Sequence, residues 1–129
     1  RFKPHTEEYS TEAELVDELK PFKEGGLTFK KNSTNLVLAP GFIEFVKKTN
    51  NLKTVVISGV LFDICVKKFA LTLRDLYDEL NRNVVIIIPL SAVDTFDSPE
   101  HNREEIFEKT SKELENNGIQ IVKKLGDRF

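Results

Sequence analysis

Two stretches of the chain lack the alternating polar positions of a half-exposed strand. Residues 54–58 read TVVIS and residues 83–90 read NVVIIIPL. Each stretch is followed by residues with the apolar spacing of a helix, over 65–80 and 106–114. Strands that are buried on both faces and alternate with helices are typical of a doubly wound parallel sheet flanked by helices. We therefore predict an α/β fold in a single domain that spans residues 1–129.

Turn and capping residues mark the remaining elements of this fold. Thr11 and Glu14 have the spacing of a capping box at the start of a helix. Pro21 ends that helix, and Gly118 fits the C-terminal cap of the last helix. The sequence also predicts a short strand at 27–31, a helix from residue 42 and a final strand at 119–122.

The composition limits the classes of partner. The chain has 19 basic and 21 acidic residues and a formal net charge of −2, so it lacks the basic surface of a nucleic-acid-binding protein. No apolar run reaches the ~20 residues of a membrane span, and the polar first residues do not resemble a signal peptide. Cys65 is the single cysteine and cannot form an internal disulfide. We expect a cytoplasmic protein, because thiols stay reduced in that compartment.

The single cysteine lies where a predicted strand ends and a helix begins. In open α/β sheets, ligands bind outside the carboxyl ends of the strands, and Cys65 follows such an end. The unpaired N–H groups of a helix start favour negative charge, so the pKa of a thiol there is expected to be lowered. The same N–H groups can stabilise an oxyanion. The alternative is that Cys65 is a small apolar core residue, and position alone leaves both interpretations open.

A nucleophilic cysteine also needs a basic or cationic partner. The two histidines, His5 and His101, have no sequence pattern that pairs them with a cysteine, and the loop around His101 predicts a capping or surface role. Lys30 and Lys31 end a predicted strand. If that strand runs parallel to residues 54–58, one of the two lysines points toward the edge of the sheet that carries the cysteine. The alternative is a solvated strand end.

Three segments of the chain occur in the same order as similar segments of a known family. Residues 59–66 read GVLFDICV, residues 29–35 read FKKNSTN, and Pro4-His5 precedes the first predicted helix. These segments resemble, in turn, the nucleophile segment, the lysine-bearing strand end and the Pro-His segment of the isochorismatase-like cysteine hydrolases. The Pro-His segment resembles the nicotinamidase branch of that family.

The resemblance implies a three-layer α/β fold and a hydrolase with an Asp-Lys-Cys triad. Cys65 would attack the amide carbon of nicotinamide, or of a similar small amide, and form an acyl-enzyme. Lys31 is the implied triad lysine, with Lys30 as the second choice. A cis peptide bond of the family maps onto Val60–Leu61, and the backbone N–H groups of Leu61 and Cys65 map onto the oxyanion hole.

The resemblance also implies partners and leaves other functions open. His5 maps onto a histidine that ligates a divalent metal ion in nicotinamidases, so zinc, iron or manganese is expected, and no organic cofactor. A homo-oligomer is expected because family members commonly assemble. The implied reaction feeds NAD salvage. The alternatives are a different isochorismatase-like hydrolase, acting on an ether or another small amide, and a catalytically inactive binding subunit.

The chain departs from the family pattern at its start. The first two family strands, which carry the triad Asp and further metal ligands, have no counterpart, and Asp63 matches an ordinary position beside the cysteine. By resemblance the absent strands lie between residues 27–31 and 54–58 in the sheet, so 54–58 is expected to have an unpaired edge. We expect the domain to be incomplete at its N-terminus and to be completed by that segment or by a second polypeptide. Alone, the chain is expected not to hydrolyse amides.

Overall fold

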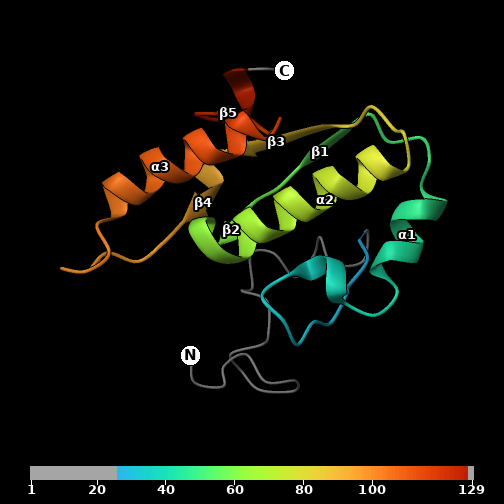
Figure 1. Cartoon of the computed structure of the whole chain (residues 1–129), viewed down its shortest axis with the longest axis horizontal. Coiled ribbons are helices and arrows are strands. Elements are labelled where there is room, and N and C mark those ends of the chain that lie inside the picture. Colours follow the sequence, from blue (N-terminus) through green and yellow to red (C-terminus); the bar gives the residue numbers. More distant parts are fainter. Residues whose placement is uncertain (1–25, 128–129) are drawn as a thin grey trace.

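The computed structural model describes residues 26–127, in which helices pack along a parallel sheet (Figure 1). The predicted helix that begins at Thr11 and the candidate ligand His5 lie outside these residues. The described elements are η3 (Leu36–Leu38), α1 (Phe42–Lys48), β1 (Thr54–Val56), β2 (Gly59–Val60), η4 (Phe62–Val66), α2 (Lys67–Glu79), β3 (Val85–Pro89), η5 (Leu90–Ala92), β4 (Val93–Asp94), α3 (Arg103–Asn116), β5 (Gln120–Val122) and η6 (Leu125–Asp127).

A parallel sheet of strand order β1-β3-β5 forms the middle of the fold. Thr54 pairs with Val85 across β1 and β3, and Ile88 pairs with Ile121 across β3 and β5. Beyond the carboxyl ends of these strands, β2 pairs in parallel with β4. The predicted α/β fold class, a parallel sheet flanked by helices, is therefore confirmed.

The central strand β3 is buried on both of its faces. Ile86 and Ile88 point to the same face and are fully buried, while Ile87 points to the opposite face and is only 3% exposed. This explains why the sequence shows an unbroken apolar run at this strand instead of an alternating pattern.

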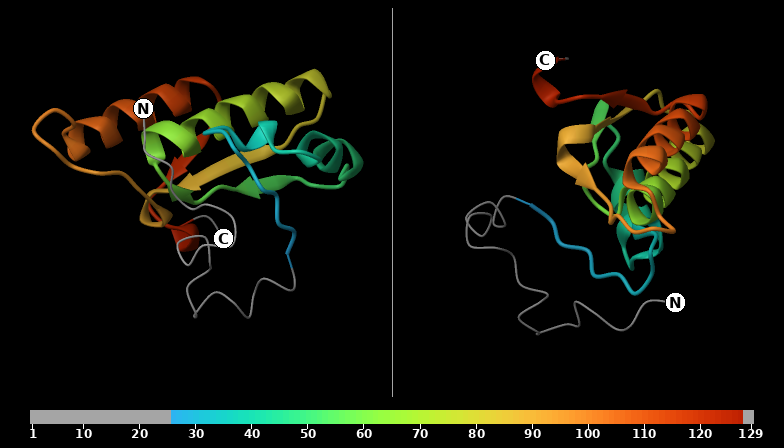
Figure 2. Two further views of the ribbon diagram at one scale, coloured as in Figure 1. Left: turned by 90° about the horizontal axis from the view of Figure 1, so that it is seen from below. Right: turned by 90° about the vertical axis from the view of Figure 1, so that its left-hand side faces the viewer.

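Helices α2 and α3 cover one face of the sheet, as Figure 2 shows. Both connections, β1 to β3 and β3 to β5, step in the same direction across the sheet, and right-handed crossovers then place their helices on the same side. The buried residues on these helices include Ala70, Leu73 and Leu114. No helix between residues 26 and 127 is long and apolar enough to cross a membrane.

Both ends of α3 are capped, and the C-terminal cap is the one that the sequence predicted. The side chain of Asn102 accepts a hydrogen bond from the N–H of Glu105 at 3.0 Å. At the other end, Gly118 has a φ of +86°, in the left-handed region that favours glycine. The N–H of Ile119 reaches back to the Leu114 carbonyl at 3.0 Å. The predicted C-terminal cap at Gly118 is thus confirmed.

The prediction of a strand at residues 27–31 is wrong, because this segment is irregular in the structure. A strand needs a neighbour to complete its backbone hydrogen bonds, and no strand among residues 26–127 pairs with it. The segment is attached by a side chain instead. The ring centroid of Phe29 lies 5.2 Å from that of Phe42 and 5.4 Å from that of Phe45, on α1.

Strand β1 is an edge strand within the described part of the chain, as expected. Its only partner there is β3, and Val56 at its end is 42% exposed although it is a large apolar residue. An exposed apolar strand edge can pair with another strand.

The central position of β3 leads to a stability prediction. Ile88→Ala removes side-chain atoms from a fully buried site and leaves a cavity, so we expect the free energy of unfolding to fall by about 2–5 kcal/mol. Ile43→Ala is the matched control, because Ile43 is 38% exposed on α1. This substitution should lower the free energy of unfolding by about 1 kcal/mol or less. Urea denaturation of both variants measures the difference, and equal losses would contradict the buried position of Ile88.

Candidate active site

The chain leaves the sheet at the carboxyl end of β1. The N–H of Ile57 donates to the carbonyl of Ile87 at 2.9 Å and extends the β1–β3 pairing by one residue. Gly59 and Val60 then pair with Val93 and Asp94 of β4. The Val60–Leu61 peptide bond is cis, at the position for which the sequence analysis predicted one.

The cysteine lies in the turn that follows, Phe62–Val66, which we call the cysteine turn. The structure begins this helical segment at Phe62 as a π-turn and continues it as α2 from Lys67, whereas the sequence predicted a helix start near Cys65. Single π-turns of this kind are frequent at functional sites. Phe62 and Val66 are buried, and Cys65 between them is partly exposed.

One carbonyl organises the hydrogen bonds of the cysteine turn. The Leu61 carbonyl accepts the N–H of Ile64 at 3.2 Å and that of Val66 at 3.0 Å. The N–H of Cys65, which lies between these two donors in the sequence, is not among the donors to that carbonyl. The Leu61 carbonyl therefore holds the backbone of the turn on both sides of Cys65.

The structure does not place Lys31 in a contact with Cys65. Its Nζ donates to the carbonyl of Ser33 at 2.9 Å, within its own turn, and the residue is exposed. Residues 27–31 are not paired in the sheet, so the strand geometry that was expected to point Lys31 toward the sheet edge is absent.

The segment after Lys31 is nevertheless attached to the helix that continues the cysteine turn. Lys68 Nζ donates to Thr34 Oγ1 at 3.0 Å, and Asn35 Nδ2 donates to Thr72 Oγ1 at 2.9 Å. Lys68 is three residues after Cys65. These bonds hold the lysine-bearing segment beside the first turns of α2.

A pair of residues that the sequence did not predict binds the cysteine turn to a distant loop. Asp63 Oδ2 lies 2.9 Å from His101 Nε2, and Asp63 Oδ1 accepts the hydroxyl of Thr95 at 2.7 Å. His101 Nδ1 lies 2.8 Å from the Phe96 carbonyl. The expected surface or capping role of His101 is therefore wrong. An aspartate two residues before the cysteine was the available signal, but nothing local indicated its partner.

The pair shifts the pKa values of both members. Burial alone raises the pKa of Asp63, but hydrogen bonds from Thr95 and His101 outweigh it and leave the pKa below its usual value of 3.8. The hydrogen bond to Asp63 raises the pKa of His101 above 6.5. Each shift favours the charged form of its side chain. Asp63 and His101 therefore form an ion pair between pH 3.8 and pH 6.5.

The described residues contain no group of three or more His, Cys, Asp or Glu side chains that could hold a metal ion. The predicted ligand His5 lies outside them. The side chains between residues 26 and 127 therefore do not provide a divalent metal centre by themselves.

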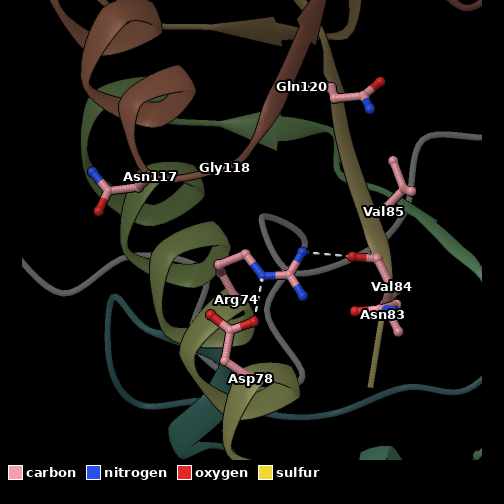
Figure 3. Close-up of a pocket in the computed structure, with 8 residues that line it drawn as sticks. All are labelled: Arg74, Asp78, Asn83, Val84, Val85, Asn117, Gly118 and Gln120. Atoms are coloured by element: carbon pink, nitrogen blue, oxygen red, sulfur yellow. Dashed lines mark hydrogen bonds and ion pairs between the residues drawn. The ribbon is translucent and has the colours of Figure 1, made fainter. Parts of the chain in front are cut away.

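A pocket lies at the amino ends of the strands, whereas the cysteine lies beyond a carboxyl end. Figure 3 shows Arg74 and Asp78 of α2 facing the amino end of β3. Arg74 is already engaged there, by the Asp78 carboxylate and the Val84 carbonyl. Ligands of open α/β sheets bind at the carboxyl ends of the strands, so this pocket is not the candidate active site.

Comparison with known families identifies the domain family of the chain. The model of the isochorismatase domain matches residues 1–105. A comparison with curated proteins finds no match.

Solved nicotinamidase structures share the fold at low sequence identity. The nicotinamidase of Staphylococcus aureus has a TM-score of 0.68 at 18% identity, over 91% of this chain and 69% of that one. The Acinetobacter baumanii nicotinamidase has a TM-score of 0.74 at 16% identity, over 98% and 60%. The yeast nicotinamidase has a TM-score of 0.68 at 18% identity, over 93% and 57%. The chain thus spans between 57% and 69% of the length of these structures.

The Asp63 contacts lead to a prediction about acid stability. Thr95→Val removes one donor, so the pKa of Asp63 should rise toward 3.8 and unfolding should become easier by about 1–3 kcal/mol at pH 6. A lowered carboxyl pKa stabilises the fold above pH 3.8 and loses this effect as pH falls through the folded-state pKa. The cost of Thr95→Val should therefore shrink between pH 6 and pH 3.

The matched control is Thr110→Val, which changes another buried threonine that is not a hydrogen-bond partner of the Asp63 carboxylate. Its cost should not depend on pH over the same range. Urea unfolding at pH 6 and pH 3 measures the free energy of unfolding of both variants. If the costs of the two substitutions changed with pH in the same way, the assigned contact between Thr95 and Asp63 would be refuted.

Proposed function

Since the chain belongs to the isochorismatase domain family, we propose that it forms part of a cysteine hydrolase that cleaves nicotinamide or a similar small amide to the acid and ammonia. The observation that carries this proposal is the place of Cys65. Its partly exposed side chain lies beyond the carboxyl end of β1, on a turn that opens the 13-residue helix α2. Ligands of such sheets bind at this edge, and a helix start stabilises negative charge.

The proposed reaction has two steps, and the chain supplies the nucleophile. The Cys65 sulfur forms a bond to the amide carbon, and the negative charge on the carbonyl oxygen is held by the N–H groups of Leu61 and Cys65. The carbon–nitrogen bond then breaks, and the nitrogen leaves as ammonia with the proton from the thiol. Water hydrolyses the thioester, which releases the acid and restores the thiol.

Lys31 is the proposed triad lysine, with Lys30 as the second choice. An ammonium group beside the thiolate stabilises it through opposite charge. The bonds of Lys68 and Asn35 to their partners keep the lysine-bearing segment beside α2. In the complete site Lys31 exchanges its bond to the Ser33 carbonyl for one in the active site.

We further propose that the triad Asp and the missing strands come from the preceding segment or from a second polypeptide. Support comes from the edge position of β1 in residues 26–127 and from the share of the nicotinamidase structures that the chain spans. A homo-oligomer and a cytoplasmic location, where the Cys65 thiol stays reduced, are part of the same proposal. So is a divalent metal ion held by His5 and by ligands outside this chain.

One observation favours a second function, that of a binding subunit without catalysis. The Nζ of Lys31 is engaged by a backbone carbonyl rather than by the cysteine. The mass of the purified protein separates the two functions. A chain of 14.8 kDa without a second polypeptide and without amidase activity supports the binding subunit, and an active protein with a further segment supports the hydrolase.

The nucleophile is tested in the full-length gene product. Cys65→Ala removes the attacking sulfur, so ammonia release from nicotinamide should fall by ~10³-fold or more, while the circular dichroism spectrum stays that of the folded protein. An isochorismate-like ether is assayed in parallel to identify the alternative reaction. Unchanged ammonia release would end the assignment of Cys65.

The choice between the two lysines is tested by a matched pair of variants. Lys31→Met should lower kcat by ~10²-fold or more because it removes the positive charge beside the thiolate, whereas Lys30→Met should have a much smaller effect. Steady-state ammonia release measures both. Equal losses, or a larger loss for Lys30→Met, would show that Lys31 is not the triad lysine.

A further inference from the structure

The ring of His101 lies between two hydrogen-bond acceptors. Nε2 faces the Asp63 carboxylate at 2.9 Å, and Nδ1 faces the Phe96 carbonyl at 2.8 Å. A neutral imidazole has only one N–H, so it can satisfy one of these acceptors at a time. Both bonds form only when the ring carries both protons and a positive charge.

The surroundings of the ring favour this charged form. The phenyl ring of Phe96 stacks on His101 with centroids 3.8 Å apart and planes 14° apart, which places an aromatic face over the cation. The His101 and Asp63 side chains are only 17% and 16% exposed, so solvent screens their attraction incompletely.

Three other charged side chains near this loop have partners other than His101. The Asp94 carboxylate accepts a hydrogen bond from the guanidinium of Arg103 at 2.8 Å. The Asp97 carboxylate accepts one from the backbone N–H of Arg103 at 3.0 Å. The Arg103 guanidinium also lies over the ring of Phe107, 4.4 Å from its centroid. Asp63 is therefore the carboxylate that pairs with His101 in the described structure.

The pair acts on the cysteine turn directly. Asp63 is the second residue of that turn and lies two residues before Cys65. One of its carboxylate oxygens is bound by His101 and the other by Thr95, so the loop after β4 holds the turn through both oxygens. The Asp63 side chain therefore links the backbone that carries the thiol to this loop.

We propose that Asp63 and His101 are positioning residues, and that His101 as an imidazolium holds the cysteine turn in its reactive position. This inference rests on the proposed function for its effect on catalysis, but the structural effect on the turn does not depend on it. When His101 loses a proton, one of its two acceptors loses its donor. The turn should therefore loosen as pH rises through the raised pKa of His101.

Two variants of His101 separate the two bonds of the ring. In His101→Gln the side-chain amide takes the place of Nε2 and can still donate to Asp63. In His101→Asn the shorter amide takes the place of Nδ1, so it can donate toward Phe96 and loses Asp63. We expect His101→Asn to lower kcat ~10- to 100-fold with little change in KM, because a displaced nucleophile affects the chemical step. His101→Gln should recover most of kcat and lose the dependence on the His101 pKa.

Hydrogen exchange tests the turn without requiring turnover. The N–H groups of Ile64 and Val66, which donate to the Leu61 carbonyl, should exchange about tenfold faster in the full-length gene product with His101→Asn. They should be nearly unchanged with His101→Gln. Equal exchange and equal kcat in the two variants would overturn the positioning role. If the unaltered full-length protein has no amidase activity and exchange is still faster in His101→Asn, the positioning role is supported and the proposed function is rejected.

A measurement on the unaltered protein covers the case in which a variant fails to fold. Imidazole nitrogen NMR shifts should show both ring nitrogens of His101 protonated at pH 6, and its titration should lie above pH 6.5. A neutral tautomer at pH 6 would overturn the proposal.

Discussion

The pairing of β3 with strands on both sides is the constraint on which the rest of the structure depends. Ile86, Ile87 and Ile88 fill both faces of this strand, and a shift of register by one residue would exchange those faces. Because the three strands run parallel, their carboxyl ends lie along one edge of the sheet. β1 ends at that edge, and the chain leads from it to Cys65 within a few residues.

Three attachments hold the turn that carries the thiol or the helix that continues it. Phe62 anchors it in the apolar core, and Asp63 binds it to a loop through charge and hydrogen bonds. Hydrogen bonds from Asn35 and Lys68 join a third segment to the helix that continues it. These attachments come from parts of the chain that are remote in sequence, and none of them occupies the sulfur of Cys65.

The features that the sequence predicted correctly depend on local patterns. The apolar run at β3, the glycine at position 118 and the place of Cys65 between a strand and a helix need only neighbouring residues to be recognised. The segment at 27–31 was assigned wrongly because a strand exists only with a partner, which no local pattern supplies. The bond between Asp63 and His101 joins residues 38 positions apart, and a lone histidine in a polar loop is normally solvated.

The aromatic contact beneath the cysteine turn links the site to a helix that supplies no reacting group. The ring of Phe62 lies with its centroid 4.8 Å from that of Phe107, on α3. A random-mutagenesis screen for inactive proteins would therefore collect hits on α3 around Phe107, which lies 42 positions downstream of Cys65. A map of such hits drawn on the sequence alone would suggest two separate functional regions, although in space they form one.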